Sequence, residues 1–160
     1  MKRLLVFTGL LFSLTTWAIP LPGQAGYSVI IDTDGAIDDM RAIALLLSRP
    51  EVRVHAILLS DGSLAPVDAY PRIRALLQAF GRDSVPVACG PILAGVDPPW
   101  REFNLNIQFK VPAGTTSSSE KSGNLLQRIL VEGADHVTLL CLGALTNVAP
   151  LVQDTAAMKQ

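Results

Sequence analysis

The chain has 160 residues and a formal net charge of −1, and 49% of its residues are hydrophobic while 17% are charged. This length suits one domain, and the hydrophobic content is high enough for a buried core, which excludes a disordered chain. The 13 Lys and Arg residues are scattered along the sequence. We therefore expect neither a nucleic acid nor an anionic membrane surface as a partner, because both require a basic patch.

Residues 1–18 have the layout of a secretory signal peptide. Two basic residues at positions 2 and 3 precede an apolar run from Leu4 to Leu14, and Thr16-Trp17-Ala18 offers a cleavage site. The apolar run is shorter than the roughly 20 residues that span a membrane, so we expect cleavage and no membrane association afterwards. The protein is thus predicted to be exported, to the periplasm or the medium, with residues 19–26 as a linker.

Strand and helix patterns alternate beyond residue 26. Apolar and β-branched runs predict strands at 27–31, 52–59, 85–89 and 137–142, and apolar residues at helical spacing predict helices at 38–48, 67–80, 124–132 and from 146 onward. Residues 90–122 contain four prolines and a polar run, and we expect a long loop there. Strands and helices in series predict the α/β class, a Rossmann-like parallel sheet with helices on both faces.

Four carboxylates, those of Asp32, Asp34, Asp38 and Asp39, follow the first predicted strand closely. Ligands of open α/β sheets bind beyond the carboxyl ends of the strands, so these acids lie where chemistry is expected. Like charges this close repel one another, and a hard divalent cation such as Ca²⁺ or Mg²⁺ would remove that repulsion. A purely structural interpretation, with Asp38 as a helix N-cap and Asp39 as a first-turn acid, accounts for only two of them.

The run VIIDTDGAIDDMRAI resembles the signature of the inosine-uridine-preferring nucleoside hydrolases, an apolar strand followed by D-x-D-P-G-x-D-D-A-x-A-I. The resemblance implies that Asp34 is the catalytic base and a Ca²⁺ ligand. It further implies that Asp39 is a second Ca²⁺ ligand, that Asp38 binds the ribose hydroxyls and that Asp32 supports the loop.

A second segment, residues 137–149, is similar to the family's strand-to-helix stretch that ends in G-P-L-T-N-I-A. This similarity implies that the main-chain carbonyl of Leu142 completes the protein side of the metal shell, with Asn147 as a supporting residue. On its own, the segment is also consistent with an ordinary strand-turn-helix unit in which Thr146 or Asn147 caps the helix. Together the two segments identify residues 27–160 as the N-terminal portion of a nucleoside hydrolase domain.

The sequence departs from the family pattern at three places. Gly35-Ala36 replaces Pro-Gly in the acidic loop, and residues 100–104 replace a His- and Gly-rich segment. Gly62-Ser63 stands where the family has Gly-Asn, so Ser63 takes the place of an asparagine that reaches the ribose. These departures leave the preferred base open.

Two other classes of function stay open. A haloacid-dehalogenase-like phosphohydrolase would use Asp32 as the nucleophile and Asp34 as the general acid with Mg²⁺, although Ala36 stands where that family has threonine. A non-catalytic module that binds a nucleoside or a sugar is the third reading. Release of phosphate without ribose would identify the phosphohydrolase. Metal-dependent ligand binding without ribose release would identify the binding module.

The favoured function is hydrolysis of the N-glycosidic bond of ribonucleosides to base and ribose by Ca²⁺-activated water. The later half of family members supplies a further Asp ligand, a His and ribose contacts, so we expect this chain to be incomplete. A homo-oligomer, the leaving-group acid and a pairing of Cys89 with Cys141 are left open, although we interpret both cysteines as buried free thiols.

Overall fold

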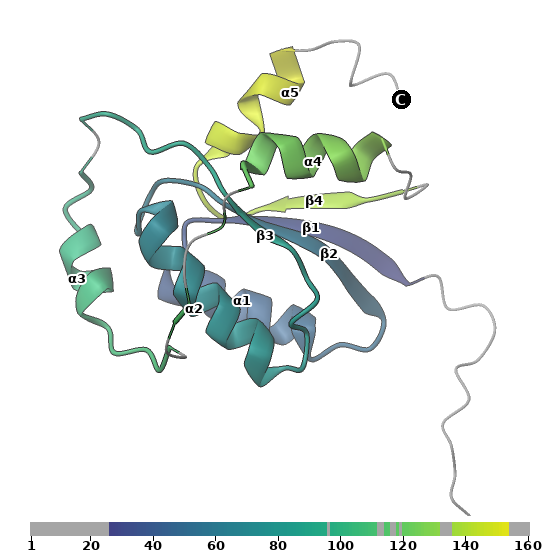
Figure 1. Cartoon of the computed structure of the whole chain (residues 1–160), viewed down its shortest axis with the longest axis horizontal. Coiled ribbons are helices and arrows are strands. Elements are labelled where there is room, and N and C mark those ends of the chain that lie inside the picture. The colour runs from purple at the N-terminus through teal and green to yellow at the C-terminus, as the bar shows by residue number, and fades with distance from the viewer. Residues whose placement is uncertain are drawn as a thin grey trace, which may run out of the picture.

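The computed structural model describes residues 26–95, 97–111, 114–115, 118, 120–131 and 136–153 (Figure 1). The predicted signal peptide and nearly all of the predicted linker lie outside these residues. Within the described ranges, no helix has both the length and the hydrophobicity needed to cross a membrane.

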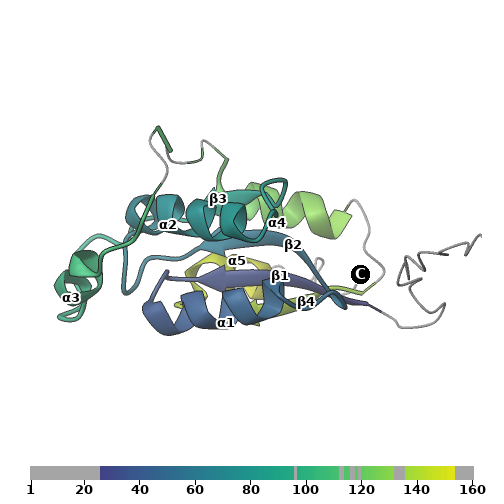
Figure 2. The ribbon, with the colours of Figure 1, turned by 90° about the horizontal axis from the view of Figure 1, so that it is seen from below.

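The described strands form one parallel sheet. They are β1 (Tyr27–Thr33), β2 (Val52–Leu59), β3 (Val87–Cys89) and β4 (Thr138–Cys141), and their order across the sheet is β3-β2-β1-β4 (Figure 2). This arrangement confirms the predicted α/β class with a parallel sheet.

Helices cover both faces of the sheet (Figure 1). On one face, α1 (Ile37–Leu47) and α2 (Pro66–Ala79) enclose a core that includes Val29 and Ile31 of β1. On the other face, α4 (Ser122–Val131) packs against Ile30 of β1 through its own leucines. The alternation along β1 is the expected one, because successive side chains of a strand point to opposite faces.

The strand order places a switch point between β1 and β4. The chain builds outward from β1 through β2 to β3 and then crosses back to pair β4 with the other side of β1. Ligands of doubly wound sheets bind where the order reverses, outside the carboxyl ends of the strands. The acidic loop after β1 lies at this position.

The elements differ from the predicted ones at several ends and in two segments, and β3 and β4 are shorter than the predicted 85–89 and 137–142. β1 runs two residues further, because Asp32 and Thr33 pair with Leu58 and Leu59 of β2. The predicted loop contains a short helix, α3 (Arg101–Asn106), beyond the carboxyl end of the sheet (Figure 1). The predicted last helix is divided into a 3-10 turn, η1 (Leu145–Asn147), and α5 (Ala149–Gln153). Pro150 explains the division, since proline has no N–H and suits the first turn of a new helix.

Cys89 and Cys141 cannot pair within the chain. They lie at the ends of β3 and β4, which are the two edge strands of the described sheet, and both are free. Three strand spacings of about 4.8 Å separate them, whereas a disulfide requires Cα atoms within about 7 Å. The interpretation as free thiols is thereby confirmed, but both side chains are half-buried rather than buried.

Candidate functional site

The acidic loop turns from the end of β1 into the start of α1 and carries its four carboxylates to different depths. Asp32 is fully buried within β1, Asp39 is buried in the first turn of α1, Asp34 is half-buried between them, and Asp38 is exposed. The N-cap of α1 is Ala36 and no side chain caps the helix, so Asp38 is not the N-cap. The purely structural interpretation of Asp38 is therefore wrong.

Asp39 is held by Thr33, a residue that the motif analysis gave no role. The Thr33 hydroxyl donates a hydrogen bond of 2.6 Å to Oδ2 of Asp39 and accepts one of 3.0 Å from the amide of Gly35. The Asp34 amide also donates to Oδ2 of Asp39, at 3.3 Å. Among the described residues, none donates a hydrogen bond to Oδ1 of Asp39, which leaves this oxygen available for a ligand.

The carboxylate of Asp34 is oriented by two backbone amides. The Ser63 amide donates to Oδ2 at 2.9 Å and the Ala36 amide donates to Oδ1 at 3.2 Å. Gly62 packs so closely that a Cβ atom on it would overlap the Asp34 carboxylate. Since each carboxylate oxygen has two lone pairs, Asp34 keeps accepting capacity while its orientation is fixed.

Asp32 is a buried carboxylate between the acidic loop and the turn after β4. Burial raises its pKa to about 6, while the neighbouring Ser60 hydroxyl and Asn147 amide partly offset this and the charges of Asp34 and Asp39 add to it. Neither carboxylate oxygen has a hydrogen bond of good geometry. The Asn147 side chain is itself fixed from its other end, because the Ser122 hydroxyl donates a bond of 2.6 Å to its Oδ1.

The electrostatics of the loop oppose full ionisation. Burial, the first cause, and the nearby charges of Asp34 and Asp38 raise the pKa of Asp39 to about 6, although the Thr33 hydrogen bond partly offsets this. Two buried carboxyls, Asp32 and Asp39, therefore share a raised pKa within one loop. A positive charge in this loop would stabilise their ionised forms.

The donor set fits a hard cation in part. Oxygen ligands are what Ca²⁺ and Mg²⁺ prefer, and Asp34 and Asp39 supply them from one loop. In the described part of the chain, however, no three His, Cys, Asp or Glu side chains come together as a metal site. The two carboxylates provide a partial shell, and a hard cation would take further oxygens from main-chain groups or water.

The segment after β4 lies against the acidic loop. The Leu142 amide donates a bond of 2.8 Å to the main-chain oxygen of Asp32, and Gly143 contacts the Asp34 backbone. Two predicted site segments, distant in sequence, are thereby brought together. The two histidines lie elsewhere, with His55 half-buried in β2 and His136 exposed.

The turn after β2 is tied to α3 by a second unforeseen pair. Arg101 of α3 donates a bond of 2.6 Å to Oδ1 of Asp61, whose side chain is fully buried. Asp61 also accepts a bond of 2.7 Å from the Leu93 amide. The sequence signal for this pair was present, an acid directly after a buried strand and a basic residue in the replaced segment, but the spacing alone did not connect them.

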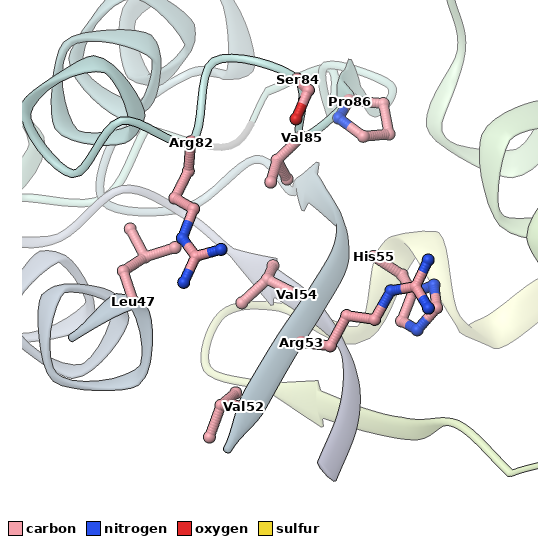
Figure 3. Close-up of a pocket in the computed structure, with 9 residues that line it drawn as sticks. All are labelled: Leu47, Val52, Arg53, Val54, His55, Arg82, Ser84, Val85 and Pro86. Carbon is pink, nitrogen blue, oxygen red and sulfur yellow. The ribbon is translucent and has the colours of Figure 1, made fainter. Parts of the chain in front are cut away.

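One cavity, of about 270 Å³, lies at the amino ends of β2 and β3, away from the acidic loop at the carboxyl ends (Figure 3). Arg82 reaches one side of β2, toward Leu47, while Arg53 and His55 lie together on the other side. No carboxylate lines this cavity. A second cavity, of about 460 Å³, opens next to Asn147 and the start of α4, and no residue of the acidic loop lines it.

Comparison with known proteins gives the same family from sequence and from structure. The model of the "Inosine-uridine preferring nucleoside hydrolase" family matches residues 29–160. The chain is 32% identical over 130 residues to the pyrimidine-specific ribonucleoside hydrolase RihA of Salmonella enteritidis, covering 78% of this chain and 42% of that protein. It is 33% identical over 129 residues to uridine nucleosidase 1 of Arabidopsis thaliana, covering 76% and 38%.

Among solved structures, the chain superposes on an inosine-guanosine nucleoside hydrolase with a TM-score of 0.69 and 26% identity, covering 82% of this chain and 44% of that one. The chain therefore spans less than half the length of these relatives. The matched residues include the acidic loop and the segment after β4.

Proposed function

Because the chain belongs to the inosine-uridine preferring nucleoside hydrolase family, we propose that the acidic loop cleaves the N-glycosidic bond of ribonucleosides to give a free base and ribose. The observation that carries the proposal is the environment of Asp34. Two backbone amides orient its carboxylate at the carboxyl end of the sheet, beside buried Asp39.

In the proposed reaction, water attacks the anomeric carbon as the bond to the base breaks. The base leaves with the bonding electron pair and takes up a proton, while Asp34 accepts a proton from the attacking water. Positive charge develops on the sugar in the transition state, and the ionised carboxylates of the loop stabilise it. Asp38, exposed in the first turn of α1, is the proposed contact to the ribose hydroxyls, with Ser63 as a second contact.

Nucleoside hydrolases use a metal ion, and for this chain we propose Ca²⁺. Asp34, Asp39 and the main-chain carbonyl of Leu142 would hold it, with Asp32 and Asn147 supporting the loop. When bound, such an ion would lower the pKa of a coordinated water and so make a nucleophile available at neutral pH. The residues of the chain then orient the water, accept its proton and hold the ribose.

The burial of Asp32 disfavours the phosphohydrolase alternative. That chemistry requires Asp32 to attack a phosphoryl group, but its carboxylate is fully buried and a nucleophile must reach its substrate. Asp34 is the more accessible of the two acids, as a base acting on water requires.

The chain spans less than half the length of its relatives, so the test uses a complete enzyme in which the later half of a family domain follows residues 27–160. This enzyme is assayed with Ca²⁺ on a panel of purine and pyrimidine nucleosides, with release of reducing sugar as the readout, and the 160-residue chain alone is expected to release little ribose. Ribose release that EDTA removes and Ca²⁺ restores is the expected result. Phosphate release from a phosphomonoester without ribose release would favour the alternative chemistry. Metal-dependent nucleoside binding without any sugar release would identify a binding module.

We also propose export through residues 1–18. N-terminal sequencing of the protein recovered from fractionated cells tests this proposal. A mature protein that begins near residue 19 and lies outside the cytoplasm is the expected outcome, and an intact N-terminus in the cytoplasmic fraction is the contrary one.

A further inference from the structure

The turn after β2 and the helix α3 are joined by a charged pair that the proposed reaction does not use. Arg101 lies in the first turn of α3, and its side chain is 14% exposed while that of Asp61 is 0% exposed. A carboxylate this deeply buried requires a partner. Arg101 is therefore part of what keeps the turn after β2 in place.

Arg101 also binds the backbone next to Asp61. Its Nη2 and Nε atoms donate bonds of 2.8 and 3.2 Å to the main-chain oxygen of Gly62. The planar guanidinium thus holds a side chain and a carbonyl of the same turn at once, which a lysine could not do with the same geometry.

The peptide that follows this carbonyl reaches the proposed base. The carbonyl of Gly62 and the amide of Ser63 belong to one peptide group, and that amide donates to Oδ2 of Asp34 at 2.9 Å. Because a peptide group is planar, holding its oxygen also fixes the direction of its N–H.

We infer that Arg101 is a positioning residue, which orients Asp34 through the Gly62–Ser63 peptide and the buried Asp61. This inference rests on the proposed function only for its effect on catalysis. The structural part, an Arg101-dependent hydrogen bond between Ser63 and Asp34, stands apart from any activity.

The chain offers a matched control at the other end of α3. Arg72 of α2 donates bonds of 2.9 and 3.1 Å to the main-chain oxygens of Asn104 and Leu105. It therefore also attaches α3 to the body of the domain, but none of its described bonds reaches the Gly62–Ser63 peptide. If Arg101 acted only by attaching α3, both arginines would matter equally.

The experiment compares Arg101→Lys with Arg72→Lys in the full chain. The first readout is hydrogen exchange of the Ser63 amide by NMR, which needs no substrate. We expect exchange to accelerate roughly three- to tenfold in Arg101→Lys, the loss of one ordinary hydrogen bond, and to stay near the parent rate in Arg72→Lys. Equal exchange in the parent chain and Arg101→Lys, or equal acceleration in both variants, would overturn the inference.

Two further readouts connect the inference to the site. Titration with Ca²⁺ should show weaker binding in Arg101→Lys than in Arg72→Lys. When Arg101→Lys is made in the complete enzyme, kcat for ribose release should fall with little change in KM. If Arg101→Lys does not fold, the double variant Asp61→Asn with Arg101→Gln serves instead. It removes the guanidinium bonds to the main-chain oxygen of Gly62 without leaving a buried charge, and the same exchange result is expected. A complete enzyme that releases no ribose would count against the proposed function, while the exchange comparison would still decide the role of Arg101.

Discussion

Gly143 lies against Asp34 so closely that a Cβ atom on the glycine would stand 2.7 Å from the Asp34 amide nitrogen and 3.1 Å from the Asp34 Cβ. The same atom would stand 2.6 Å from the Ser60 hydroxyl. The turn after β4 therefore needs a residue without a side chain, because the acidic loop fills the space that a Cβ atom would take.

Gly143→Ala should displace the acidic loop. We expect a loss of about 1–3 kcal/mol in the free energy of unfolding from overpacking, together with weaker Ca²⁺ binding. Gly123→Ala is the matched control, since a Cβ atom there meets nothing within 4 Å and alanine favours the helix. Urea denaturation and calcium titration of both variants measure these effects, and equal stability of the two would contradict the close approach.

In the complete enzyme, Asp34→Asn should remove the proposed base while keeping the fold. A positioned general base contributes roughly 10²- to 10⁴-fold to rate, so we expect kcat for ribose release to fall by at least that factor. The amide keeps one oxygen acceptor for the Ser63 or the Ala36 amide, and circular dichroism should match that of the parent chain. A variant with the parent kcat would exclude Asp34 as the base.

The metal-free chain should lose stability as the pH rises. The pKa of Asp39 is raised from 3.8 to about 6 by burial first and by nearby carboxylates second, and so is that of Asp32. A carboxyl with a higher pKa in the folded chain binds its proton more tightly there. The stability that this proton confers is complete below about pH 4 and is lost as the pH rises through about 6.

For one such carboxyl, the free energy of unfolding should fall by roughly 3 kcal/mol. Urea denaturation between pH 4 and 7.5 in the presence of EDTA measures this fall. Asp39→Asn should remove part of this pH dependence, because the amide does not ionise, and the part due to Asp32 should remain. Added Ca²⁺ should restore stability at pH 7.5 more than at pH 5. A stability that rises over this pH range without metal would contradict the raised pKa values.

Ser122→Ala should loosen Asn147. The substitution leaves the buried Oδ1 of Asn147 without its 2.6 Å donor, and an unpaired buried acceptor costs about 1–3 kcal/mol. Ser48→Ala is a control, since Ser48 also donates a hydrogen bond, to the Leu45 oxygen, but at an exposed position. Thermal denaturation of both variants should show a lower Tm for Ser122→Ala alone.

Sequence periodicity predicted the sheet and its main helices because buried strands and amphipathic helices have distinct spacings. The bounds of β2 were predicted without error, as 52–59. α3 was missed because a helix of six residues shows too little periodicity to register beside the prolines that precede it. Its anchors are long-range contacts from Asp61 and Arg72, which no local pattern contains.

The motif correctly placed the four acids in one loop, but it did not predict how each acid packs. The structure brings Asp34, Asp39 and the turn after β4 together and leaves Asp38 exposed. Ser63, which aligns with the family's ribose-contacting asparagine, lies beside Asp34, and its contact there is made by the backbone amide. A backbone contact is independent of residue type, so the sequence holds no signal for it.

The central position of β1 has a consequence for how the chain folds. β1 precedes the other described elements in the chain, yet one of its two neighbours, β4, pairs with it more than 100 residues later, Val29 with Thr138 and Asp32 with Cys141. Parallel pairing over such a sequence separation raises the contact order, and high contact order slows folding. Until the ribosome has released β4, the edge of β1 that pairs with β4 stays unpaired. The nascent chain is most prone to aggregation in that interval.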